Sequence, residues 1–259
     1  MGESEINPRT APPSGAGGAI LVTGGAGGIG SAICRKFAEA GYSVIITYNS
    51  DKNKAEKLLK SLSEGNHAIF HAPNTDVQKL QNLSKFIEEK YEKLDVLVNN
   101  AGITTPVKHD DLDGLSDEWI DKILQTNIRG TFAMIRAMKL FLEKSEEPLI
   151  VNISSVSAIS GIGSNVIYCA SKAAIDSITR SLARALAPKI RVVSVSPGWV
   201  LGEYTQNIDP EYLQTQIDKT PLGRLANAED VANTVLALTT HLTFTTGSII
   251  QVDGGRLLL

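Results

Sequence analysis

A tyrosine and a lysine four positions apart, Tyr168 and Lys172, are the residues whose types and spacing point most directly to chemistry. Residues at this spacing on a helix share one face and lie about one turn apart. A neighbouring ammonium favours a phenolate, so the pair would lower the tyrosine pKa from about 10 towards working pH. Proton transfer between an alcohol and a ketone needs such a group. We therefore predict that Tyr168 is an acid/base. The non-catalytic alternative is an exposed helix on which the aliphatic part of Lys172 covers apolar surface and its ammonium reaches water.

A glycine-rich segment near the start of the chain is the second candidate for chemistry. Thr23–Gly30 reads Thr-Gly-Gly-Ala-Gly-Gly-Ile-Gly and lies between an apolar run and a helical pattern. Glycine permits a tight turn and a close approach of backbone N–H groups to a pyrophosphate, and the positive end of the helix favours that anion. Glycine also serves ordinary turns, but a site between strand and helix is the context that a dinucleotide motif needs. We expect contacts to a dinucleotide from Gly24, Gly27, Gly28, Ile29 and Gly30.

The elements that must position these residues are short apolar runs alternating with longer helical patterns. Continuous apolar character over about five residues is typical of strands buried on both faces of a parallel sheet. Strands are predicted over Ala19–Thr23, Ser43–Thr47, Ala68–His71, Val96–Asn99, Leu149–Ser154, Arg191–Ser196 and Ser248–Val252, and the longest helices over Asp117–Lys144 and Ala170–Ala187. This alternation predicts an α/β, single-domain Rossmann fold with a doubly wound, seven-stranded parallel sheet flanked by helices.

Two segments depart from this alternation. Residues 1–18 are rich in proline, glycine and serine, and we expect a disordered N-terminal leader before one domain over residues 19–259. Gly198–Pro221 follows a strand, carries turn residues and is long enough for a mobile lid over a site.

Composition excludes several classes of function. A net charge of −3 offers no support for nucleic-acid binding. The two cysteines, Cys34 and Cys169, predict no disulfide framework, and the four histidines have no metal-ligand spacing, so we expect no metal. No apolar run approaches the roughly 20 residues that cross a bilayer. These features predict a soluble cytoplasmic protein without a membrane or nucleic-acid partner.

The order and spacing of these motifs resemble the short-chain dehydrogenase/reductase family over Ala19–Gly255, beginning with the Thr-Gly-x-x-x-Gly-x-Gly spacing of Thr23–Gly30. The resemblance implies an oxidoreductase that moves a hydride between a nicotinamide cofactor and a carbonyl or secondary alcohol. It implies that Ser155 hydrogen-bonds the substrate oxygen, with the adjacent Ser154 as the rival. It also implies that Asn127 holds a water leading to Lys172; otherwise Asn127 is a polar surface residue in a helix.

The same resemblance implies further cofactor contacts. Asn99-Asn100-Ala101-Gly102 is similar to the motif that passes the adenine ribose, and Asp76-Val77 looks like the pair that contacts adenine. Pro197-Gly198 resembles the turn beside the nicotinamide, with Val200 just beyond it. The family's threonine after this turn is missing, so either Thr205 or backbone groups make that contact. The resulting set of cofactor residues adds Asp76, Val77, Asn100, Ala101, Gly102, Tyr168, Lys172, Pro197, Gly198 and Val200 to the glycine loop.

The choice between NAD and NADP depends on the end of the second strand, where an acid would bind the ribose 2′-hydroxyl and select NAD. Tyr48, Asn49 and Ser50 occupy this place, so no carboxylate repels a 2′-phosphate. The basic residue expected for NADP is missing here and in the glycine loop, although Lys52 could reach in from the next turn. We expect NADP(H) to be favoured over NAD(H), because repulsion is absent.

Substrate and assembly are less tightly constrained by the sequence. The expected pocket residues mix apolar walls with hydrogen-bonding groups and are Ser157, Ile159, Asn165, Trp199, Val200 and Tyr204. They suit a 3-oxoacyl thioester, a ketone, or a sugar or polyol. The resemblance implies a homo-oligomer, a dimer or a tetramer, and the Leu257-Leu258-Leu259 tail suits a subunit contact. The alternative is a non-catalytic, NADP(H)-binding redox sensor, which should have lost Tyr168 or Lys172.

Overall fold

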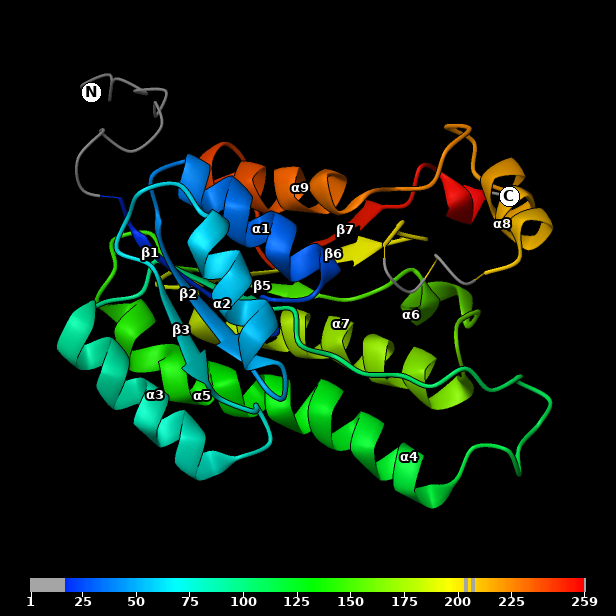
Figure 1. Ribbon diagram of the computed structural model, residues 1–259, viewed down its shortest axis with the longest axis horizontal. Coiled ribbons are helices and arrows are strands. Elements are labelled where there is room, and N and C mark those ends of the chain that lie inside the picture. Colours follow the sequence, from blue (N-terminus) through cyan, green and yellow to red (C-terminus); the bar gives the residue numbers. More distant parts are fainter. Residues whose placement is uncertain (1–16, 203–204, 206–207, 259) are drawn as a thin grey trace.

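A single parallel sheet organises the molecule. The computed structural model describes residues 17–202, 205 and 208–258. Its strands run in the order β3-β2-β1-β4-β5-β6-β7 (Figure 1). They are β1 (Ala19–Val22), β2 (Ser43–Tyr48), β3 (Ala68–His71), β4 (Val96–Asn99), β5 (Leu149–Ile153), β6 (Arg191–Pro197) and β7 (Ile249–Val252). The predicted doubly wound α/β fold is confirmed, and the strand order reverses between β1 and β4, the place where such folds bind ligands.

Helices cover both faces of this sheet (Figure 1). One layer holds α1 (Gly28–Glu39), α2 (Lys52–Ser61) and α9 (Ala228–Thr240); the other holds α3 (Val77–Lys90), α4 (Asp117–Ile123), α5 (Thr131–Glu143) and α7 (Val166–Leu186). Successive residues of a strand serve opposite layers, so Ile20 packs with α1 and α9 while Leu21 packs with α3 and α5. Burial on both faces explains why the strands read as unbroken apolar runs.

Backbone pairing with the sheet extends one residue before β1, which begins at Ala19 as predicted. Ser43 N donates to Gly18 O over 2.9 Å, so Gly18 already pairs with the sheet, although we place it in the expected leader. The rest of that leader, residues 1–16, lies outside the described residues.

The predicted continuous helix over Asp117–Lys144 is wrong in its middle. A π-helical segment, Leu124–Gly130, separates α4 from α5. Asn127 sits in this segment and is buried. The wider π turn coincides with the side-chain hydrogen bonds of Asn127, and such turns are frequent at functional sites.

Two further helices differ from expectation at their N-termini. α7 begins at Val166 rather than Ala170, because Asn165 Oδ1 accepts a 2.7 Å bond from Tyr168 N and caps the helix. α9 is absent from the predicted elements, yet Asn227 and Asp230 form a capping box at its start. Both helix starts are marked by polar cap residues, which a prediction from the spacing of apolar residues does not detect.

The segment after β6 carries regular structure of its own. Within the predicted lid, Gly198–Pro221, Asp209 caps α8 (Pro210–Asp218), with a proline in the first turn of the helix. α8 and the short α6 (Ser157–Ser160) lie beyond the carboxyl ends of β5 and β6 (Figure 1). Tyr204, a predicted pocket residue, lies outside the described residues.

Candidate active site

The glycine loop between β1 and α1 makes a turn that side chains would obstruct. Gly24 has a φ of +59°, and Gly27 N donates to Gly24 O over 3.0 Å. A Cβ atom on Gly30 would lie 2.6 Å from Gly24 O and 2.8 Å from Asn100 Nδ2. Glycine at these positions is therefore required by backbone conformation and by close packing.

The start of α1 has no side-chain cap. Gly27 stands at the cap position and, like Gly28, is exposed. By contrast, aspartate side chains cap α2 and α3, through Asp51 and Asp76. The uncapped N–H groups at the positive end of α1 suit an anion. Together with the close-packed turn, they fit the pyrophosphate of a dinucleotide.

The segment Asn100–Gly102, which follows β4, holds the glycine loop in place by hydrogen bonds. Asn100 Nδ2 donates to Thr23 O over 3.0 Å and to Gly24 O over 3.1 Å. The backbone N–H groups of Asn100 and Ala101 both donate to Thr23 Oγ1, over 3.0 and 2.9 Å. The side chain of Asn100 therefore fixes the loop, and Gly102 brings the backbone beside Lys172 and Asn127.

The residues expected near adenosine lie at the adjoining strand ends. Asp76 caps α3 by accepting from Lys79 N over 3.1 Å, and Val77 is 43% exposed. Tyr48 ends β2, with its ring centroid 5.4 Å from that of His71. Asn49 and Ser50, which follow it, are exposed. These side chains are thus at the surface of the carboxyl-terminal edge, apart from the capping carboxylate of Asp76.

Lys172 is buried directly beneath the predicted acid/base. Its Nζ donates to Ile153 O over 2.8 Å and lies 5.6 Å from the ring centroid of Tyr168. Tyr168 itself is half-buried. Burial lowers the pKa of Lys172 to about 8, and the nearby Asp176 carboxylate opposes that shift.

Asp176 is a residue that the sequence analysis missed. It is buried one helical turn from Lys172 on α7. Burial raises the pKa of its carboxyl, while hydrogen bonds with Ser154 and Ser194 and the charge of Arg180 oppose the rise. Its position four residues after Lys172 was the available signal, because residues at that spacing share a helix face.

Asn127 is tied into the site by its whole side chain. Its Oδ1 accepts from Ile103 N over 2.9 Å, and its Nδ2 donates to Ile103 O and to Ser171 Oγ, each over 3.0 Å. Ser171 Oγ in turn donates to Tyr168 O over 2.7 Å. The alternative of a surface position for Asn127 is wrong, since the residue connects the chain after β4 to the helix that carries Tyr168.

The two serines after β5 have different surroundings. Ser154 Oγ donates to Lys172 O over 3.2 Å, inside the protein. Ser155 Oγ donates to Ser157 Oγ over 3.1 Å and accepts from Ser157 N over 3.2 Å. Ser154 is thus engaged with α7, whereas Ser157 orients the hydroxyl of Ser155, the residue predicted to contact substrate.

The remaining predicted residues surround the turn after β6. Gly198 N donates to Val252 O over 3.0 Å, and Val200 pairs with Ala226 in an isolated bridge. Thr205 Oγ1 accepts from Gly202 N and donates to Gly202 O, so its hydroxyl closes a local turn. Pro197 ends β6.

The expected substrate-pocket residues differ in burial and in the contacts that they make. Asn165 is buried as the cap of α7 and donates to Thr105 O over 2.7 Å, which makes it a structural residue. Ile159 is exposed, and the ring centroid of Trp199 lies 6.0 Å from that of Tyr212 on α8.

Within the described residues, no group of three or more His, Cys, Asp or Glu side chains is arranged to hold a metal ion, and no helix is long and apolar enough to span a membrane.

Known proteins are similar to this chain over nearly its whole length. The family model described as Enoyl-(Acyl carrier protein) reductase matches residues 24–256. The chain is 35% identical over 240 residues to the 3-oxoacyl-(acyl-carrier-protein) reductase FabG of Aquifex aeolicus (strain VF5), covering 91% of this chain and 95% of that protein. It is 33% identical over 239 residues to the reductase of the same name from Staphylococcus aureus (strain Mu50), covering 91% and 96%. A solved short-chain dehydrogenase/reductase of Brucella melitensis, titled glucose/ribitol dehydrogenase, superposes with a TM-score of 0.85 at 30% identity, covering 92% and 96%.

Proposed function

The chain belongs to the short-chain dehydrogenase/reductase family and is an oxidoreductase, and from this premise we propose that Tyr168 is the acid/base of hydride transfer between NADP(H) and a carbonyl or secondary alcohol. The observation that carries the proposal is the packing of the buried Lys172 ammonium 5.6 Å from the Tyr168 ring centroid. A positive charge at that place favours the phenolate and prepares Tyr168 for proton transfer.

Each side chain of the site then has a distinct task. Ser155, held by the backbone N–H of Ser157, redirects its hydroxyl proton from Ser157 Oγ to the substrate oxygen and stabilises the charge that develops there. Tyr168 gives a proton to that oxygen in reduction and takes it back in oxidation. Lys172 holds its positive charge below the ring, and Asn127 fixes the helix through Ser171. When bound, the nicotinamide ring supplies or accepts the hydride.

For the cofactor, we propose a preference for NADP(H). Tyr48, Asn49 and Ser50 place no carboxylate where a 2′-phosphate would be repelled. The glycine loop, with exposed Gly27 and an uncapped α1, suits the pyrophosphate that both nucleotides share.

For the substrate, we favour a 3-oxoacyl thioester. The two relatives described above are named as reductases of 3-oxoacyl groups on acyl carrier protein. A sugar or polyol is the second candidate, because the Brucella melitensis structure is titled a glucose/ribitol dehydrogenase.

Fluorescence titration with NADPH and NADH, followed by an absorbance screen of carbonyl substrates, tests the proposal. We expect tighter binding of NADPH and its consumption with a 3-oxoacyl thioester. Tighter binding of NADH would contradict the cofactor preference and direct the screen to polyols in the oxidative direction. Binding without turnover on any substrate would contradict the catalytic role of Tyr168 and favour a redox sensor.

A further inference from the structure

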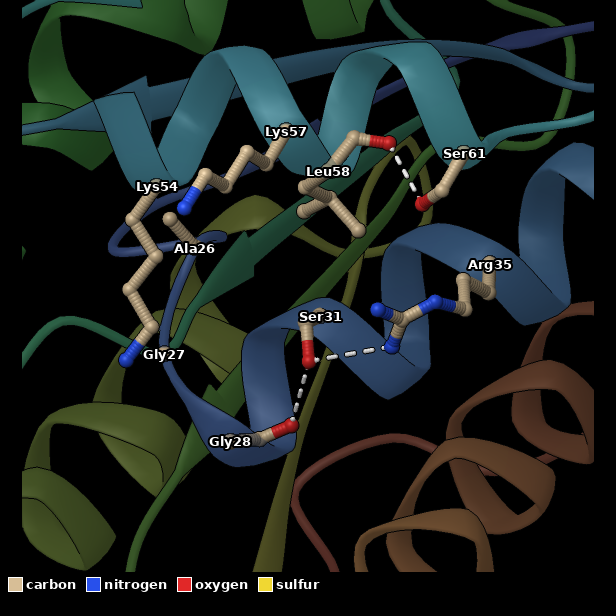
Figure 2. Close-up of a pocket in the computed structure, with 9 residues that line it drawn as sticks. All are labelled: Ala26, Gly27, Gly28, Ser31, Arg35, Lys54, Lys57, Leu58 and Ser61. Atoms are coloured by element: carbon tan, nitrogen blue, oxygen red, sulfur yellow. Dashed lines mark hydrogen bonds between the residues drawn. The ribbon is translucent and has the colours of Figure 1, made fainter. Parts of the chain in front are cut away.

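A cavity of about 280 Å³ lies between α1 and α2, directly beside the glycine loop (Figure 2). Its walls come from the loop and from the facing surfaces of the two helices. The lining residues are Ala26, Gly27, Gly28, Ser31, Arg35, Lys54, Lys57, Leu58 and Ser61. The cavity therefore opens at the segment that is suited to hold a dinucleotide pyrophosphate.

Three of the nine lining residues are cationic, and none is acidic. Lys54 and Lys57 extend from α2 towards the glycine loop, and Arg35 projects from α1 (Figure 2). Arg35 Nη1 donates to Ser31 Oγ over 3.3 Å, and Ser31 Oγ donates to Gly28 O over 2.9 Å. The guanidinium is thus linked to the end of the loop by two hydrogen bonds.

Lys52, the lysine that the sequence suggested for this task, has a different partner. Its Nζ pairs with Glu56 Oε1 at 3.3 Å on the outer face of α2, and it does not line the cavity. Lys54 is half-buried against the cavity wall, whereas Lys52 is exposed. The candidate cations are therefore Lys54 and Lys57, which lie further along α2 than Lys52.

The loop itself leaves room for an anion in front of these cations. A Cβ atom on Gly28 would meet nothing within 4 Å, and one on Gly27 would meet only Gly24 O, at 3.4 Å. In dinucleotide-binding folds, the group at the ribose 2′ position is read at the end of the second strand. Here that strand ends at Tyr48, and the connection leads directly into the helix that carries Lys54 and Lys57.

We propose that Lys54 and Lys57, supported by Arg35, bind the 2′-phosphate of NADP(H) and determine cofactor specificity; this inference rests on the proposed function. A phosphate dianion gains charge-assisted hydrogen bonds from ammonium and guanidinium groups. NADH has no charge at this place and gains nothing from them. The cations thus supply the attraction that neither the residues after β2 nor the glycine loop provides.

The test is the affinity of the double variant Lys54→Gln/Lys57→Gln for NADPH and NADH, measured by fluorescence titration. The matched control is Lys52→Gln/Lys60→Gln, which removes the same charge from the same helix outside the cavity. We expect the first variant to weaken NADPH binding by about tenfold or more, with NADH binding changed by less than about twofold. The control should keep both affinities within about twofold of wild type.

Competition separates a nucleotide phosphate from a free anion. Adenosine 2′,5′-bisphosphate should displace NADPH from wild type at lower concentration than 5′-AMP, and the double variant should lose this advantage. Inorganic phosphate that competes as well as the bisphosphate would overturn the assignment, as would unchanged NADPH affinity in the double variant. If wild type binds neither dinucleotide, the proposed function fails as well, so the two failures are distinguishable.

Discussion

The charge on Lys172 connects the chemistry of Tyr168 to the stability of the fold. The ammonium is buried, and this lowers its pKa from the ordinary lysine value of 10.5 to about 8. The folded state therefore binds fewer protons than the unfolded chain between these two values. Stability rises with pH wherever the unfolded state binds more protons. The cost of burying this charge is present in full below pH 8 and is relieved as the pH approaches 10.5.

We predict that the free energy of unfolding of wild type rises relative to that of Lys172→Met as the pH increases through this window. The relative gain should not exceed about 3 kcal/mol, the equivalent of the whole shift in pKa. Urea denaturation of both proteins at neutral and at alkaline pH measures it. A difference between the two proteins that stays constant with pH would show that Lys172 is not buried as a charged group.

Single residues also show what the sequence could and could not predict about the site. Tyr168 and Lys172 were recognisable because their spacing along a helix has a direct geometric meaning. Asp176 shares that spacing but required burial to gain importance, and burial depends on β5 and β6 packing against α7. The sequence suggested Lys52 for the 2′-phosphate, and only the structure shows that Lys52 pairs with Glu56 while Lys54 lines the cavity.

Among the elements, α1 begins without a side-chain cap, and we propose that this end of the helix binds the cofactor phosphates. Gly27 stands at its N-cap with a φ of −77°, a conformation that any residue can adopt. Aspartate is a better cap than glycine, by a few tenths of a kcal/mol. We predict that Gly27→Asp stabilises the protein without cofactor by roughly this amount, yet loses most of its affinity for NADPH because the carboxylate occupies and repels the phosphate site.

Thermal unfolding and fluorescence titration of the same variant measure both effects. Gly27→Ser is the control, because it caps the helix without adding a charge and should bind NADPH more tightly than Gly27→Asp. Affinity of Gly27→Asp equal to that of wild type would contradict the assignment of the loop as the phosphate site.

Strands were easier to predict than helix boundaries. Strands such as β1 and β4 are buried along their whole length, and their apolar runs stop where the sheet stops. Helix boundaries depend on caps and on tertiary contacts. The π-helical segment at Leu124–Gly130 has no periodic signature, because it is tied to hydrogen bonds between Asn127 and residues far away in the chain.

At the scale of the whole molecule, exposed apolar side chains lie beside β7, the strand at one edge of the sheet. β7 ends the sheet and is only half-buried. Leu222 and Leu258 line a common cavity beside it, and Leu258 is 83% exposed. Exposed apolar patches and strand edges are frequent sites of association. We propose that a second copy of the chain covers this edge in a homo-oligomer.

We predict that the Leu258→Asp variant forms smaller oligomers than wild type. Its circular dichroism spectrum should match that of wild type, because the substitution is at the surface of the subunit. Sedimentation velocity measures the size. Leu112→Asp, at an exposed leucine in the connection before α4, is the control and should sediment like wild type. A monomeric wild type would contradict the proposed assembly.

The central claim, that Tyr168 is the acid/base of hydride transfer, is tested most directly by measuring NADPH consumption with a 3-oxoacyl thioester for wild type and Tyr168→Phe. Tyr91→Phe is the matched control, since its hydroxyl bonds to Asn66 O at the opposite end of the fold from the site. We predict that Tyr168→Phe binds NADPH like wild type but loses turnover by about a hundredfold or more, whereas Tyr91→Phe keeps it. Turnover of Tyr168→Phe close to that of wild type would contradict the account.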